Sequence, residues 1–91
     1  EGRSVRDTVS SPRLDAVVAA GFSISRSKAA DLINAGHVKL RHIPCLRTDA
    51  HVGEGDAVSV RGLGRLKLCE IGQPTRKGRY PLSMLRFGER K

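Results

Sequence analysis

The chain has 91 residues, a formal net charge of +8, two cysteines and only three aromatic residues. This length excludes more than one ordinary domain, and aliphatic side chains have to supply most of a small core. No apolar run approaches the ~20 residues of a membrane-spanning helix, no signal peptide is recognisable, and the isolated Cys45 and Cys69 favour reduced thiols over a disulfide. Because the chain begins with Glu1 and not with methionine, we expect a processed product or a piece of a longer protein.

The positive charge is concentrated in the last third of the chain. Residues 1–60 contain eight Lys/Arg against seven Asp/Glu, a balance of +1. Residues 61–91 contain nine against two, a balance of +7. A solvated basic surface that only keeps the protein soluble is the simpler interpretation, but this asymmetry favours a nucleic acid or another anionic partner.

The N-terminal part of the chain predicts a lead-in followed by a helix. Residues 1–9 are polar, mixed in charge and without a hydrophobic period, so we expect a flexible segment. Ser10 or Ser11 can cap a helix over about residues 12–20, which begins with a proline at a position where the missing amide costs nothing. Apolar residues then recur on one face, and Gly21 is expected to end this helix.

A second helix is expected shortly afterwards, and the rest of the chain is arranged around its first turn. Ser25 is a suitable N-cap, because its hydroxyl can accept a hydrogen bond from the free amides of that turn. Ile24 and Ala29 form a hydrophobic staple, and Gly36 supplies the left-handed residue that ends the helix. Free amides, the positive end of the helix dipole and three polar side chains suit this turn to hold phosphate. Those side chains are Arg26, Ser27 and Lys28.

Short alternating segments after the second helix predict a small antiparallel sheet. In the clearest hairpin the apolar residues at alternate positions point inward, and the outer face becomes a positively charged ribbon. The inward residues are Val58, Val60, Leu66 and Leu68, and the outward residues are Ser59, Arg61, Arg65 and Lys67. The expected strands are residues 37–40, 45–48, 57–61 and 65–71, with turns at 53–56 and 62–64.

A basic loop and a last strand complete the expected sheet. Residues 72–78 form the loop, and residues 79–87 form the strand. We place this strand at a sheet edge, because Pro81 cannot donate a hydrogen bond to a neighbouring strand. Residues 88–91 are expected to be a polar tail. The basic residues of the loop and the start of the strand are Arg76, Lys77 and Arg79.

Five short motifs occur in a characteristic order and spacing. They are Arg13-Leu14-Asp15, Gly21-Phe22, Ser25-Arg26-Ser27-Lys28-Ala29, Gly36-His37-Val38 and Gly55-Asp56. Together they make the segment from about residue 13 to residue 60 resemble the S4-type RNA-binding domain. The resemblance implies an α+β fold in which two packed helices lie on a small, mainly antiparallel sheet with a C-terminal hairpin and strand extension. It also implies RNA binding across the N-terminus of the second helix and the adjoining strands. One departure is Arg41, where many members have Asn after the first strand.

The C-terminal part carries a narrower resemblance. Its motifs are Gly64-Arg65-Leu66, Glu70-Ile71-Gly72 and Thr75-Arg76-Lys77-Gly78-Arg79-Tyr80. They are similar to the segment that closes the cyanobacterial and plastid photosystem II S4 domain proteins, whose bacterial relatives are associated with ribosomes and the rescue of stalled translation. This resemblance implies a role in translation without catalysis, with rRNA or tRNA on the ribosome as partner. It places the protein in the chloroplast stroma, with the bacterial cytoplasm as the alternative.

We therefore divide the chain into a flexible lead-in (1–9), an S4-type RNA-binding core (10–60) and a basic C-terminal β extension (61–91). Phosphate contacts would give affinity and orientation, and few aromatic residues are available to stack on unpaired bases, so we expect recognition of folded or helical RNA by its shape. The candidate RNA-binding residues are Arg13, Ser25, Arg26, Ser27, Lys28, Lys39, Arg41, Arg61, Arg65, Lys67, Arg76, Lys77 and Arg79.

Three of these candidates carry a further expectation about their surroundings. Arg13 either reaches phosphate or pairs with a carboxylate such as Asp31. Lys39 and Arg41 are expected to project towards the same side as the second helix.

No arrangement of residues points to catalysis, a metal or a cofactor. His42 and Cys45 could supply two zinc ligands, but the other candidates lie on separate elements. The pair Gly62 and Gly64 lacks the third glycine of a dinucleotide site, and no Gly-x-Ser-x-Gly motif is present. We expect no enzyme and no small-molecule substrate. Two alternatives remain open: a non-catalytic adaptor that binds an anionic membrane or protein complex, and the targeting domain of a larger RNA-modifying enzyme.

Overall fold

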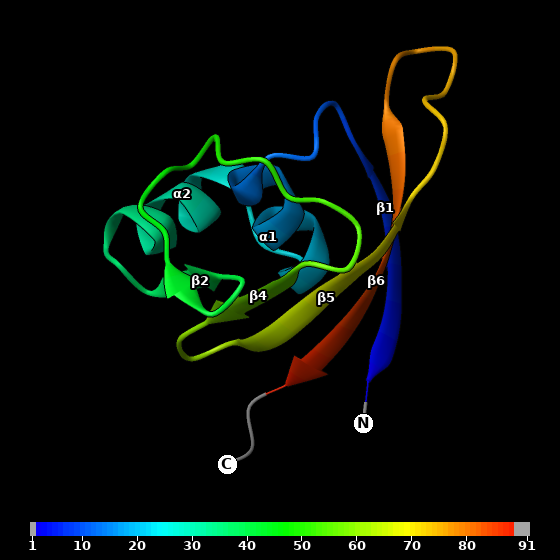
Figure 1. Cartoon of the computed structure of the whole chain (residues 1–91). Helices are drawn as coiled ribbons and strands as arrows, with labels where there is room; N and C mark the ends of the chain where they lie inside the picture. Colours follow the sequence, from blue (N-terminus) through cyan, green and yellow to red (C-terminus); the bar gives the residue numbers. More distant parts are fainter. Residues whose placement is uncertain (1, 89–91) are drawn as a thin grey trace.

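The computed structural model describes residues 2–88 and shows two helices packed on one face of a six-stranded sheet (Figure 1). The strand order is β1-β6-β5-β4-β2-β3, and every neighbouring pair is antiparallel. The predicted α+β architecture is therefore confirmed. The elements are β1 (Arg3–Val9), α1 (Leu14–Phe22), α2 (Arg26–Asn34), β2 (Val38–Leu40), β3 (Ile43–Pro44), β4 (Ala57–Val60), β5 (Gly64–Ile71) and β6 (Tyr80–Gly88).

The hydrophobic core lies between the helices and the sheet, because alternate residues of each strand point towards the helices. The predicted inward residues of the hairpin between β4 and β5 are all buried to 1% exposure or less. They pack in one cluster with residues from both helices and from β2 and β6. The fully buried partners include Leu14, Val17, Ile33, Val38, Leu82 and Met84. Nearly the whole core is aliphatic, as the composition requires.

The boundaries of α2 follow the local sequence signals. The Ser25 hydroxyl accepts a hydrogen bond from the backbone amide of Lys28 at 3.0 Å, which confirms the predicted N-cap. Gly36 has a φ of +83°, and the amides of Gly36 and His37 donate to the carbonyls of Ile33 and Leu32. This pattern is the Schellman motif, which a left-handed glycine permits after the last helical turn.

The boundaries of α1 differ from the prediction. The helix begins at Leu14, after Arg13 at the N-cap position, and continues through Gly21 to Phe22. Gly21 has a packing role in place of the expected stop: a Cβ atom there would lie 2.4 Å from Leu66 Cδ2, so only glycine lets α1 approach β5 this closely. Ser23, with a φ of +58°, is the left-handed residue that ends the helix.

The prediction of a flexible lead-in over residues 1–9 is wrong for Arg3–Val9, which form β1. This strand pairs with β6 along its whole length, from Arg3 opposite Arg86 to Val9 opposite Tyr80. Its sequence holds too few apolar residues for a visible period, so the pairing with β6 stabilises it more than its own side chains do. Glu1 lies outside the described residues.

The prediction of an edge position for the last strand is also wrong, because β6 lies between β1 and β5. Pro81 is accommodated by its place in the ladder. Its carbonyl accepts from the amide of Gly72, so its missing amide faces the β5 side. On that side, the last paired residues of β5 and β6 are Ile71 and Leu82, so Pro81 lies just beyond the end of the β5–β6 ladder. Of the expected polar tail, only Gly88 belongs to the described residues, and it ends β6.

The short strand expected at residues 45–48 is displaced to Ile43–Pro44, directly after a two-residue turn. Arg41 and His42 form this turn with φ values of +52° and +69°. Both residues adopt the left-handed region that tight two-residue hairpins require, usually with Asn or Gly. The hairpin thus closes immediately after β2. The amide of Cys45 still donates to the carbonyl of Val38 at 3.0 Å, and none of the expected residues 45–48 belongs to a strand.

Candidate nucleic-acid interface

The first turn of α2 presents its polar residues to solvent. Ser25, Arg26, Ser27 and Lys28 are all exposed, and the serine hydroxyl satisfies one of the free amides of the turn. The remaining amides and the positive end of the helix dipole lie beside two cationic side chains. Such a turn can bind a phosphate group.

A buried carboxylate holds two of the candidate arginines in place. Asp15, in the first turn of α1, is only 6% exposed. Its two oxygens accept from Arg13 Nε at 3.0 Å and Arg13 Nη2 at 3.1 Å, and one oxygen also accepts from Arg26 Nη2 at 3.2 Å. Arg13 therefore pairs with Asp15 and not with Asp31. We call these three residues, Arg13, Asp15 and Arg26, the Asp15 cluster.

The Asp15 cluster leaves its arginines available to a ligand. The side chains of Arg13 and Arg26 keep 38% and 51% exposure, while that of Asp15 keeps 9%. A guanidinium has five N–H donors, so one edge can hold the carboxylate while the others remain free. The ion pairs therefore fix the direction of the two cations, and the charge of the cluster remains +1.

Arg79, from the far end of the chain, lies close to this surface. Its guanidinium donates to the hydroxyl of Thr8 at 3.0 Å and to the carbonyl of Thr8 at 2.6 Å. Arg79 and Arg26 line the same depression of about 240 Å³, together with Ile24 and residues of β1 and α1. The tertiary structure thus brings two of the predicted residues to one place.

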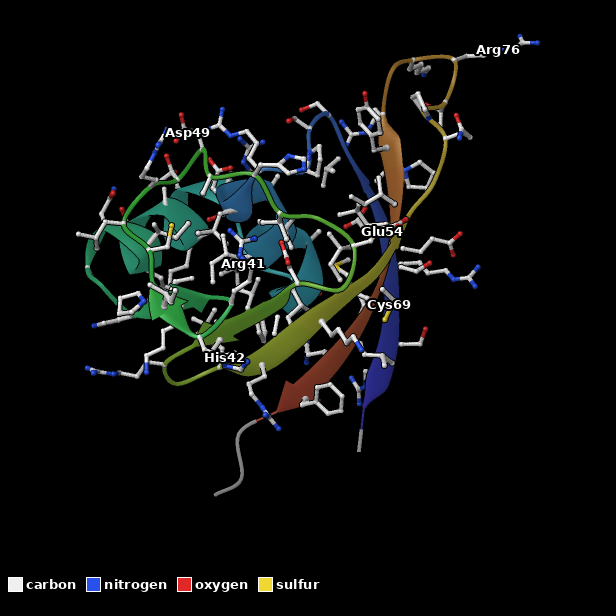
Figure 2. All side chains as sticks on the ribbon, viewed as in Figure 1. Arg41, His42, Asp49, Glu54, Cys69 and Arg76 are labelled. Atoms are coloured by element: carbon white, nitrogen blue, oxygen red, sulfur yellow. The ribbon has the colours of Figure 1, made fainter. Side chains whose placement is uncertain are left out.

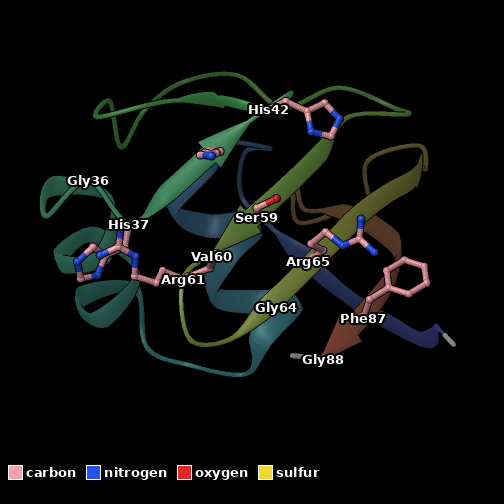
Figure 3. Close-up of a pocket in the computed structure, with 11 residues that line it drawn as sticks. Gly36, His37, His42, Ser59, Val60, Arg61, Gly64, Arg65, Phe87 and Gly88 are labelled. Atoms are coloured by element: carbon pink, nitrogen blue, oxygen red, sulfur yellow. The ribbon is translucent and has the colours of Figure 1, made fainter. Parts of the chain in front are cut away.

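The face of the sheet opposite the helices carries a second group of candidates. Lys39, Ser59, Arg65 and Phe87 are consecutive partners in the ladders that join β2, β4, β5 and β6. They form one row across the sheet, and all four line a groove of about 500 Å³ (Figure 3). We call this surface the open sheet face. It also includes Lys67, two residues after Arg65 on the same side of β5, and Arg61 in the turn before β5.

Lys39 does not lie as expected, and Arg41 is held by a carboxylate. Lys39 stands between the buried residues Val38 and Leu40, so its side chain points away from the helices and belongs to the open sheet face. The expectation that it shares the side of α2 is wrong. Arg41 Nη1 donates to Asp56 Oδ2 at 2.6 Å, and its side chain remains 57% exposed. Arg41 thus links the turn between β2 and β3 to the turn before β4.

Arg76 and Lys77 lie in the loop between β5 and β6, and both are exposed. Figure 2 shows Arg76 at the tip of this loop, pointing away from the rest of the molecule. The loop closes through hydrogen bonds between Thr75 and both Gly78 and Arg79. The structure therefore does not bring Arg76 together with the Asp15 cluster or with the open sheet face.

Sequence reasoning missed several residues of the groove. Phe87 lies in the row of the open sheet face, with the Arg65 guanidinium carbon 5.7 Å from its ring centroid. His37 and His42 line the same groove. The alternation of β6 could have indicated the outward direction of Phe87, since Leu82 and Met84 point inward. Its position beside Arg65 depends on the strand order and could not be read locally.

Residues 2–88 contain no group of three or more His, Cys, Asp or Glu side chains that could hold a metal ion. Cys45 and Cys69 are both free thiols. None of the helices within the same range is long and apolar enough to cross a membrane.

Comparison with known proteins agrees with this architecture. The model of the S4 domain family matches residues 12–58, which is more than half of the chain. The chain therefore belongs to the S4 domain family. The matched segment includes both helices, the Asp15 cluster and the first turn of α2.

A curated relative extends the similarity into the C-terminal part. The chain is 40% identical over 80 residues to the ribosome-associated protein quality control protein P2 of Bacillus subtilis (strain 168). The alignment covers 88% of this chain and 31% of the relative. The chain thus spans about a third of the length of the curated relative that it matches.

Proposed function

We propose that this chain is a non-catalytic RNA-binding module that docks on structured RNA, either rRNA or tRNA, on the ribosome. The observation that carries this proposal is the Asp15 cluster beside the first turn of α2. A buried carboxylate holds the guanidinium of Arg26, the first residue of α2, where free amides, Lys28 and the helix dipole already favour an anion. Arg79 adds a third cation at the neighbouring depression.

The chemistry of this surface favours a phosphate backbone over other anions. Cations of fixed direction suit phosphate oxygens, which accept paired N–H groups from arginine. Contacts of this kind orient a protein on RNA but read little sequence. The Bacillus relative is named as a ribosome-associated protein, which supports the ribosome as the place where such RNA is bound.

The setting of this activity is a further part of the proposal. The C-terminal segment resembles photosystem II S4 domain proteins and supports the chloroplast stroma. The bacterial relative supports the second candidate, the bacterial cytoplasm. In either setting we propose a role in translation with no cofactor and no small-molecule substrate.

The experiment is filter binding of the full chain to an RNA hairpin, single-stranded RNA and duplex DNA over a series of salt concentrations. With about 4–6 phosphates neutralised, the logarithm of the binding constant should fall with the logarithm of salt at a slope of about −3 to −5. We expect the hairpin to bind most tightly. The double variant Arg26→Gln/Lys28→Gln should lower hairpin affinity at least about tenfold and reduce the slope by about 2.

A matched control removes the same charge elsewhere. Arg3 and Arg6 are exposed on the edge strand β1 and line neither the depression beside Arg26 nor the groove of the open sheet face. The variant Arg3→Gln/Arg6→Gln should therefore lower hairpin affinity much less. Equal losses in the two double variants, with no preference among the three nucleic acids, would show a general polyanion binder and would direct the search to anionic membranes or protein complexes.

A further inference from the structure

The groove of the open sheet face differs in chemistry from the surface at α2. It crosses four strands and is lined by backbone and small residues at its floor, with Lys39, Arg61 and Arg65 around it (Figure 3). None of the described residues that line it is acidic. Its volume of about 500 Å³ is in the range of pockets that hold small organic groups. The groove can therefore accept a group that is partly flat and apolar and partly anionic.

An aromatic ring at one end of the groove gives it a stacking surface. The guanidinium of Arg65 lies over the ring of Phe87, with 5.7 Å between the guanidinium carbon and the ring centroid. Phe87 is only partly buried, and it lies outside the aliphatic core, which occupies the other face of the sheet. Nucleobases stack on aromatic rings and on guanidinium planes. The Arg65–Phe87 pair brings a guanidinium and an aromatic ring together at this end of the groove.

In the described part of the chain, the cationic side chains around the groove are not held by ion pairs as Arg13 and Arg26 are held by Asp15. The ion pairs among the described residues involve Arg13, Arg26, Arg41 and Arg47. Lys39, Arg61 and Arg65 take no part in them. A phosphate entering the groove would thus meet cations that form no ion pair with a carboxylate of residues 2–88.

From these observations we propose that the open sheet face binds an unpaired nucleotide segment. One base stacks against the Arg65–Phe87 pair, and the adjoining phosphates lie on Arg61 and Lys39. This inference rests on the proposed RNA-binding function and adds a second contact to it. The Asp15 cluster and α2 bind the backbone of a folded RNA, and the opposite face of the sheet binds a single-stranded stretch next to it.

The experiment compares three RNA hairpins that have the same duplex and differ only in their single-stranded overhang. The full chain is titrated with a blunt hairpin, with the same hairpin carrying a four-nucleotide overhang, and with a hairpin whose overhang has abasic sites. The abasic overhang keeps the phosphates and removes the stacking groups. We expect the base-bearing overhang to bind at least about fivefold more tightly than the abasic one, which corresponds to one base stacked on an aromatic ring.

Two variants of Phe87 connect this difference to the proposed contact. Phe87→Leu should bring the affinities of the base-bearing and abasic overhangs together and leave binding of the blunt hairpin unchanged. Phe87→Tyr keeps a ring and should preserve the difference. Thermal unfolding of both variants, followed by circular dichroism, identifies a loss of affinity that is caused by a loss of fold.

The outcomes separate this inference from the function on which it rests. If the blunt hairpin binds but base-bearing and abasic overhangs bind equally, the open sheet face does not stack a base, and the RNA-binding function stands. An acidic protein as the true occupant of this face would give the same equality. If the difference persists in Phe87→Leu, the base binds elsewhere and the assignment to this groove is overturned. If none of the hairpins binds, the proposed function itself fails.

Discussion

The two cationic surfaces of this protein are held in place in different ways. In the Asp15 cluster, a carboxylate that is 6% exposed holds two arginines at 3.0–3.2 Å. On the open sheet face, the positions of Lys39 and Arg65 follow from strand register, and neither residue forms an ion pair within residues 2–88. Substitutions in the first surface should therefore change both folding and binding, whereas substitutions on the second should change binding alone.

The largest loss of stability is expected when the carboxylate of Asp15 is removed. Asp15→Ala leaves Arg13 and Arg26 without their partner and removes an acidic residue from the first turn of α1. Because both arginines are partly exposed and regain water, we expect the free energy of unfolding to fall by about 2 kcal/mol, less than for a fully buried pair. Urea unfolding measures it. Asp31→Ala, at an exposed position of α2, is the matched control, and an equal cost in both variants would contradict the anchoring role.

A slightly smaller loss of stability is expected from a substitution in the hydrophobic core, which lies between the helices and the sheet and separates the two surfaces. Gly21→Ala would place a methyl group 2.4 Å from Leu66 Cδ2, which the fully buried leucine cannot avoid without moving. We expect a net loss of about 1–2 kcal/mol, because overpacking outweighs the higher helix propensity of alanine. In a double-mutant cycle, Gly21→Ala combined with Leu66→Ala should cost less than the sum of the two single changes. Additive costs would show that the two side chains do not compete for space.

The turn between β2 and β3 should show a gain in stability. His42 has a φ of +69°, a conformation that glycine adopts without steric cost. His42→Gly should raise the free energy of unfolding by about 0.5–1 kcal/mol. Arg41→Gly relieves similar strain but also removes the hydrogen bond to Asp56, so its gain should be smaller. Thermal melting of the two variants ranks them, and the reverse order would show that the ion pair has little weight.

The smallest change in stability is expected on the open sheet face. Lys39→Gln/Lys67→Gln removes two exposed cations that make no ion pair among the described residues. The free energy of unfolding should stay within about 0.5 kcal/mol of the original value. The salt slope of RNA binding should fall by about 1–2 if both lysines contact phosphate. A large loss of stability would show that the two surfaces do not differ as described.

Local sequence signals were sufficient for α2 and for the hairpin between β4 and β5. The N-cap at Ser25 and the left-handed Gly36 act through hydrogen bonds to residues a few positions away. The alternation of apolar residues likewise sets which side chains of a strand share a face. The same local reasoning misplaced the end of α1, because Gly21 is explained by contact with Leu66, from a strand far along the chain.

Local signals could not reveal β1 or the central position of β6. The two strands stabilise each other by pairing residues from opposite ends of the chain, such as Arg3 with Arg86. A strand with few apolar residues has no periodicity of its own, and a proline is acceptable in an inner strand when the neighbouring ladder has already ended. Both facts depend on the neighbours that the fold supplies.

The sequence by itself determined the kinds of residue available for binding: an excess of cations in its last third, a capped helix with a basic first turn, and a basic ribbon. Only the tertiary structure decided which of these residues share a surface. It joined Arg26 to Arg79 through a common depression, paired Arg26 of α2 with Asp15 of α1, and placed Lys39 on the far side of the sheet. The physical reason is that charge and capping act locally along the chain, whereas the order of strands in a sheet is set by packing between distant segments.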